Sequence, residues 1–180
     1  MIGCEQTQGI NILQHGEMVH DYYVDLEAHI LKGSALRYEW KLPEWARSPA
    51  LWRARVDEET VKNYMVFHDC GKPFCKEVDQ DGKVHFPDHA AVSAKVWRDA
   101  GGSEAEGRLI ERDMGIHLLK AEGLQAFAQE PEAGTLLLAG LCEIHANASM
   151  FGGIESTSFK MKWKHIDRRG KQIAALMSGR

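Results

Sequence analysis

The segment His68-Asp69-Cys70-Gly71-Lys72 combines residue types that could do metal and phosphate chemistry. A neutral imidazole and a carboxylate in adjacent positions can bind one divalent ion, or two ions that share the carboxylate. Lys72, three residues after the aspartate, adds a positive charge where an anionic substrate could bind. Because any histidine can precede any aspartate, the pair alone indicates little, and the other histidines decide whether this segment is a site.

Five histidines lie at core-facing positions of the helices that the sequence predicts: His15, His68, His89, His117 and His145. A lone histidine on an apolar helix face is more often a core residue with a hydrogen-bonded ring nitrogen than a metal ligand. Five of them would leave many ring nitrogens to satisfy in a small core, and a shared metal centre satisfies them together. His20, His85 and His165 lie off the apolar stripes. His29 is roughly 20 Å from His15 along one helix, so both cannot contact the same ion.

Apolar residues recur every three or four positions along most of the chain, which predicts an all-α fold. Helices are expected over residues 12–30, 57–67, 88–96, 103–117 and 135–148. Residues 35–55, which contain three tryptophans and two prolines, are expected to form a loop with short helical turns. Asp81-Gly82 between short alternating stretches predicts a small β-hairpin near residues 74–86. We therefore expect one all-α domain over residues 1–180, a helical bundle with a small β-hairpin insertion.

Composition bounds the function classes. With 26 acidic and 22 basic residues, the chain carries no general electrostatic attraction to nucleic acid or to anionic membranes. No stretch of 18 apolar residues and no signal peptide is present, so we expect a cytoplasmic protein without a membrane partner. The four cysteines form no C-x-x-C motif, which favours free thiols. Cys70 and Cys75 are not expected as ligands, because thiolates suit tetrahedral zinc rather than a site of imidazole and oxygen.

The motif residues resemble those of a known family. His15, then His68-Asp69-x-Gly-Lys72-Pro73, then His89 resembles the HD-domain superfamily of metal-dependent phosphohydrolases. The segments 67–74 and 86–90 are similar to the HD domains fused to tRNA nucleotidyltransferases and to small HD proteins of bacteria and phages. The resemblance implies an all-helical fold that binds one or two divalent metal ions (Zn, Mn, Ni, Fe or Mg) and hydrolyses phosphate esters.

The same resemblance implies a role for each matching residue. His15, His68 and Asp69 match the ligands of a first ion. His89 and His117 match the histidines that hold a second ion in two-metal members, and Asp69 would then bridge the two ions.

The final ligand departs from the family pattern. Members of this type close the first metal site with a late aspartate, but the corresponding helix here reads Glu143-Ile-His-Ala-Asn147. Helical phase favours His145 as the final ligand, and Asn147 and Asp113 are the alternatives. A neutral final ligand would make the centre more positive by one charge.

The predicted function is hydrolysis of a phosphate ester by a metal-activated hydroxide. Asp69 would bridge the ions and Lys72 would stabilise charge on the phosphoryl oxygens, so these two residues are the predicted catalytic groups. With a single ion, Glu143 or Asp113 could activate the water.

A basic tail follows residue 156, and its cations are Lys160, Lys162, Lys164, Arg168, Arg169 and Lys171. It is either a solvated helix face or a clamp for a substrate with several phosphates, such as a nucleotide or an RNA end. Lys160 and Lys164, four residues apart, are the predicted substrate-binding pair, together with Lys72.

Two other functions fit the same residues. A non-catalytic HD-type module could bind RNA or a protein partner, and the missing late aspartate favours it. An HD-type mixed-valence di-iron oxygenase would use a similar ligand series, although Lys72 favours phosphate chemistry. The sequence does not indicate the substrate among phosphorylated small molecules, nucleotides and RNA ends, nor the oligomeric state.

Overall fold

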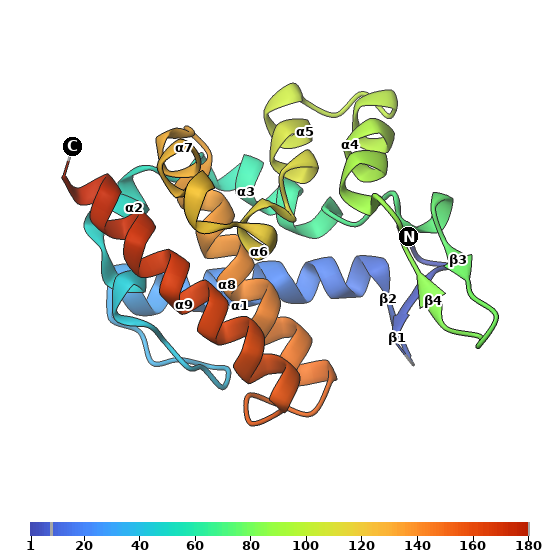
Figure 1. Ribbon diagram of the computed structural model, residues 1–180, viewed down its shortest axis with the longest axis horizontal. Helices are drawn as coiled ribbons and strands as arrows, with labels where there is room; N and C mark the ends of the chain where they lie inside the picture. The colour runs from blue at the N-terminus through green and yellow to red at the C-terminus, as the bar shows by residue number, and fades with distance from the viewer. Residues whose placement is uncertain (8, 180) are drawn as a thin grey trace. The chain divides into compact units, whose positions relative to one another are not determined.

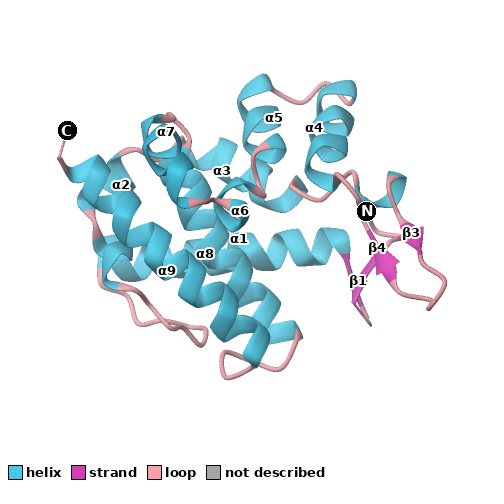
Figure 2. Cartoon of the chain, in the orientation of Figure 1, coloured by secondary structure: helices cyan, strands magenta, loops and turns pink. Residues whose placement is uncertain are grey.

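Helices dominate the structure, a computed structural model that describes residues 1–7 and 9–179 (Figure 1, Figure 2). Of the structure, 65% is helical and 5% lies in strands, which confirms the predicted all-α class with a small β insertion. None of the described helices combines the length and the apolar character needed to cross a membrane. The chain comprises two compact units, Met1–Met18 with Glu58–Met114 (unit 1) and Val19–Asp57 with Gly115–Arg180 (unit 2). The single domain expected from the sequence stays a prediction.

Unit 1 contains two small antiparallel hairpins and the helices around the His-Asp pair. Strand β1 (Glu5–Thr7) pairs with β2 (Ile10–Asn11), and β3 (Glu77–Val78) pairs with β4 (Val84–His85). The helical elements are the first turns of α1 (Ile12–Lys32), then α3 (Glu58–Phe67), the short 3-10 helix η2 (Lys72–Phe74), α4 (His89–Asp99) and α5 (Glu104–Glu111). The hairpin of β3 and β4 lies where the sequence predicted it. The hairpin of β1 and β2 was not predicted.

Helix α5 begins as predicted and ends early. Ser103 and Glu106 form the expected capping box, in which each side chain accepts a hydrogen bond from the backbone N–H of the other residue. The predicted continuation to His117 is wrong, since α5 ends at Glu111 and His117 lies in a separate helix, α6 (Gly115–Leu118). Between these helices, the Asp113 side chain accepts a hydrogen bond from the distant Tyr64 hydroxyl, a contact that helical periodicity does not reveal.

Unit 2 is built around α8 (Ala133–Met150), most of whose residues are buried. Its other elements are the rest of α1, η1 (Glu44–Arg47), α2 (Pro49–Arg53), α6, η3 (Ala121–Gly123), α7 (Leu124–Gln129) and α9 (Thr157–Ser178). The basic tail after Ser156 is therefore a helix of 22 residues, and it packs against α2, α7 and α8 (Figure 1). Gly170 makes part of this packing possible, because a Cβ there would lie 2.2 Å from the Trp45 ring.

Candidate metal centre

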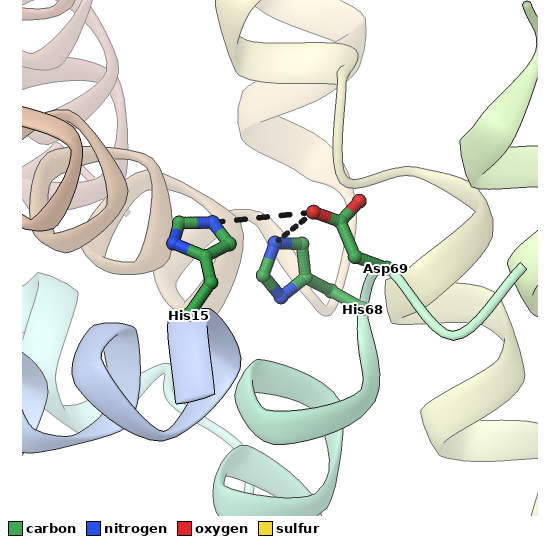
Figure 3. Close-up of side chains that lie close together, drawn as sticks. All are labelled: His15, His68 and Asp69. Carbon is green, nitrogen blue, oxygen red and sulfur yellow. Dashed lines mark ion pairs between the residues drawn. The ribbon is translucent and has the colours of Figure 1, made fainter. Parts of the chain in front are cut away.

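Three side chains of unit 1, His15, His68 and Asp69, bring possible metal-ligating atoms together (Figure 3). His15 projects from the start of α1, and the other two residues follow the last residue of α3. One carboxylate oxygen, Asp69 Oδ2, is 3.9 Å from His15 Nε2 and 3.3 Å from His68 Nε2. The three side chains are buried, and their ligand atoms lie within 4.8 Å of one another. Two imidazoles and a carboxylate at this spacing could hold a divalent ion.

Backbone hydrogen bonds orient two of the imidazoles toward Asp69. His68 Nδ1 lies 2.8 Å from the Met65 carbonyl oxygen and His89 Nδ1 lies 3.1 Å from that of Phe86. A carbonyl can only accept, so Nδ1 carries a proton in each ring and Nε2 is the nitrogen that faces Asp69. His89 Nε2 is 3.7 Å from Asp69 Oδ1, the oxygen that does not face His68. The two oxygens of Asp69 therefore face different imidazoles, and its role as a bridge between two ions stays a prediction.

Lys72 is part of the same cluster. Its ammonium lies 2.5 Å from Asp69 Oδ2 and 3.0 Å from Oε1 of Gln6 in β1. It also lies 5.3 Å from the centre of the Phe86 ring, and the whole side chain is buried. Lys72 thus neutralises Asp69 directly, and the predicted contact with a substrate phosphate requires the ammonium to leave this carboxylate.

The electrostatic surroundings keep Asp69 ionised. Burial alone would raise the pKa of the Asp69 carboxyl group, but the charges and hydrogen bonds of His68 and then Lys72 hold this pKa well below its usual range. Burial, together with the Asp69 charge, raises the pKa of the Cys70 thiol to about 11. Cys70 is therefore a neutral thiol at pH 7 in this structure. All four cysteines are free, as predicted.

Two glycines allow the close backbone contacts that assemble the cluster. A Cβ on Gly16 would lie 2.1 Å from the Val66 carbonyl oxygen, so α1 and α3 touch through their backbones next to His15. A Cβ on Gly71 would lie 2.3 Å from the Ser93 nitrogen in α4, and the Ser93 hydroxyl accepts a hydrogen bond of 2.8 Å from the Gly71 N–H. The glycine of the His-Asp-x-Gly-Lys motif is thus a packing requirement.

We expect Gly16→Ala to lower the free energy of unfolding by about 1–3 kcal/mol, the usual effect of overpacking. In an unobstructed helix interior the same change would stabilise the protein by about 1 kcal/mol. Here the added methyl group would overlap a backbone carbonyl, which cannot rotate away as a side chain can. Urea denaturation measures the change. Gly107→Ala in α5 is the matched control, because its methyl group would face the movable Arg98 side chain, and equal effects of both changes would contradict the packing argument.

Asp113 is a further buried carboxylate of unit 1 close to this cluster. Its Oδ1 accepts a hydrogen bond of 2.6 Å from the Tyr64 hydroxyl, which orients the group. One of its possible ligand atoms lies within 4.8 Å of one on His68. Of the three residues considered for the final ligand, Asp113 is the one that shares unit 1 with His68.

His117 belongs to a hydrogen-bonded group of unit 2. Its Nε2 lies 2.7 Å from Glu143 Oε2, and the Asn147 side-chain amide donates to Glu143 Oε1 at 3.4 Å. His117 as a ligand of a second ion and Glu143 as a base both stay predictions.

His145, the residue that helical phase favoured as the final ligand, is buried in unit 2 beside the rings of Trp40 and Phe159. Its Nδ1 donates to the Leu141 carbonyl oxygen at 2.8 Å, and its Nε2 accepts from the Lys41 backbone N–H at 3.1 Å. Backbone groups therefore occupy both ring nitrogens, and His145 as the final ligand, which would require Nε2 to give up the Lys41 N–H, stays a prediction. Helical phase placed it correctly in the core and could not reveal its partners.

The predicted substrate-binding pair, Lys160 and Lys164, is exposed on α9 in unit 2. Lys160 Nζ forms an ion pair of 2.7 Å with Glu155. Their contact with substrate phosphates stays a prediction. Gln6, which holds the Lys72 ammonium, was missed by sequence reasoning, and no motif marks it.

The fold and the site together define a helical protein with a buried His-Asp cluster that could hold a metal ion. Comparisons with protein-family models, with curated proteins and with solved structures gave no match. Membership of the HD-domain superfamily therefore stays a proposal, which rests on the motif residues and their geometry.

Proposed function

We propose that this protein is a metal-dependent phosphohydrolase of the HD type, acting on the phosphate ester of a nucleotide or an RNA end. The observation that carries the proposal is the convergence of His15, His68 and His89 on the buried Asp69 carboxylate. Lys72 beside this carboxylate supplies the cation that a phosphoryl group needs.

The donor set fits a divalent transition-metal ion. Imidazole nitrogens and a carboxylate oxygen suit Zn, Fe, Ni and Mn, and the ionised state of Asp69 meets the requirement that a ligand be deprotonated. A divalent ion bound there would supply a Lewis acid that polarises a phosphoryl oxygen and makes water more acidic.

The protein's own residues would share the remaining tasks. His15 and His68 would hold the ion, and their burial limits competing water. The Lys72 ammonium, once Asp69 is neutralised by another cation, can turn to the charge on the phosphoryl oxygens. Gln6 and Phe86 would keep the ammonium close to the site during this change.

Elemental analysis of protein purified without chelator tests the proposal. We expect one or two equivalents of a transition metal in the unaltered protein and a loss of at least one equivalent in Asp69→Asn. His85→Gln, which alters an exposed histidine of the β3–β4 hairpin, is the control and should retain the metal. An unaltered protein that neither contains metal nor binds added Mn or Ni would contradict the proposal.

Two further measurements sharpen the result. Asp113→Asn should lower the metal content or affinity if Asp113 completes the site, and should leave both unchanged otherwise. A chromogenic phosphate monoester and diester then test catalysis by the metal-loaded protein, with Asp69→Asn as the inactive reference.

A non-catalytic module is the second candidate, and the Lys72–Asp69 ion pair favours it because the lysine already neutralises the carboxylate. A metal-loaded protein without activity on any phosphate ester would support this alternative. Iron in the protein together with an oxygen-dependent absorption spectrum would support the di-iron oxygenase instead.

A further inference from the structure

Positive charge is concentrated on one helix of this acidic protein. Helix α9 carries six of the 22 lysines and arginines but only one of the 26 acidic residues. The rest of the chain therefore has 16 basic and 25 acidic residues. The overall balance, which argued against nucleic-acid binding, conceals this local excess.

Four of these cations form a stripe along the exposed side of α9: Lys160, Lys164, Arg168 and Lys171. At 100° per residue they fall within an arc of about 80° and span roughly 16 Å along the helix. The buried side of the helix, which includes Phe159, Ile166 and Ile173, faces away from this arc. Lys162 lies about 160° around the helix from both Lys160 and Lys164, outside the stripe.

The stripe remains available to an anionic partner. Lys164 and Arg168 form no ion pair with another residue in the described part of the chain. Lys160 pairs with Glu155 and Lys171 pairs with Asp167, but both lysines are more than half exposed. Ion pairs at such positions contribute about 0–1 kcal/mol, so phosphates can replace these carboxylates.

A cation from a second segment borders the stripe. The Lys41 ammonium lies 4.3 Å from the centre of the Trp163 ring, and the Trp163 indole N–H donates to the Lys41 carbonyl oxygen at 2.8 Å. Trp163 is adjacent to Lys164 in sequence and one turn from Lys160, so the loop before η1 adds a fifth charge beside the helix.

We propose that the stripe of α9, with Lys41 at its edge, binds the phosphodiester backbone of nucleic acid. A row of exposed, flexible cations on a single convex helix suits sequence-independent contact with successive phosphates, in which released counterions supply the free energy. The binding depends on residues of unit 2 and needs no metal, so it stands apart from the hydrolysis proposed above.

Fluorescence anisotropy with a labelled 20-nucleotide single-stranded RNA of mixed sequence, in the presence of chelator, tests this binding. Each phosphate contact with a single strand contributes about 0.7 to the slope of log Kd against log salt concentration. About four contacts should therefore give a slope of about 3. A triple change of Lys160, Lys164 and Arg168 to Gln should weaken binding at least tenfold at low salt and lower the salt dependence by about 2.

Two matched controls separate the stripe from net charge. The triple change of Lys62, Lys76 and Lys83 to Gln removes three exposed lysines of unit 1 and should bind like the unaltered protein. Within α9, Lys162→Gln should weaken binding less than Lys164→Gln, although each removes one charge. Equal losses in stripe and control variants, or no RNA binding at low salt, would overturn the proposal. Binding to vesicles of anionic lipid but not to RNA would overturn it in favour of a membrane surface.

Discussion

Lys72→Met is expected to raise the affinity of unit 1 for a divalent metal ion by about 10- to 100-fold. The Lys72 ammonium and the proposed ion compete for the same oxygen, Asp69 Oδ2. Two unit charges 4 Å apart interact by about 1 kcal/mol in water and by about 4 kcal/mol near a protein surface. Since about 1.4 kcal/mol corresponds to a tenfold change in affinity, an effect between these limits changes the affinity by about 10- to 100-fold. Removing the competing charge therefore favours the ion.

The same variant is expected to be less stable without metal. Lys72 and Asp69 are both buried, and removing one partner of a buried ion pair costs about 3–5 kcal/mol because the other charge is left in the interior. Metal binds only the folded state in this scheme, so added Mn or Zn should recover stability in proportion to its affinity.

Calorimetric titration with Mn gives the affinity, and urea denaturation with and without metal gives the stability. Lys62→Met, an exposed lysine of α3, is the control and should leave both unchanged. Weaker metal binding by Lys72→Met would show that the lysine orients Asp69 for the ion rather than competing with it. If the protein hydrolyses phosphate esters through Lys72, the variant should bind metal more tightly and turn over more slowly.

Helical periodicity predicted the long elements because each has a continuous apolar face. The helices expected over residues 12–30, 57–67 and 135–148 match α1, α3 and α8 closely. The end of α5 at Glu111 was not predicted, and the Asp113–Tyr64 hydrogen bond that follows it joins residues 49 positions apart, a contact that local periodicity does not reveal. Strands of two or three residues, such as β1 and β2, are too short to show an alternating pattern.

The candidate site was predictable to the extent that helix phase and motif order determine it. His15, His68 and Asp69 were expected together, and the structure brings them together. Helical phase shows only that a residue is buried, so it could not reveal which groups the His145 ring contacts. Its partner Lys41 lies 104 positions away in the sequence. Gln6 is a similar case, because a contact 66 positions from Lys72 leaves no local signal.

Between pH 6.5 and pH 4, His145 is expected to cost the folded protein about 3 kcal/mol of stability. Burial lowers the pKa of His145 from 6.5 to about 4. As the pH falls through this interval, the unfolded chain takes up a proton that the folded protein does not. The stability that comes from keeping His145 neutral is therefore fully present above pH 6.5, decreases as the pH falls, and is lost at about pH 4.

Urea denaturation of the unaltered protein and of His145→Gln at several pH values between 7 and 4 isolates this effect. Glutamine keeps hydrogen-bonding groups but does not titrate, so the stability difference between the two proteins should shrink by about 3 kcal/mol across the interval. The carboxyl groups of Asp25 and Glu106, whose pKa values lie below their ordinary ones, contribute equally to both proteins and cancel. A difference that does not change with pH would show that His145 takes up its proton at the same pH in the folded and the unfolded chain, and would contradict the lowered pKa.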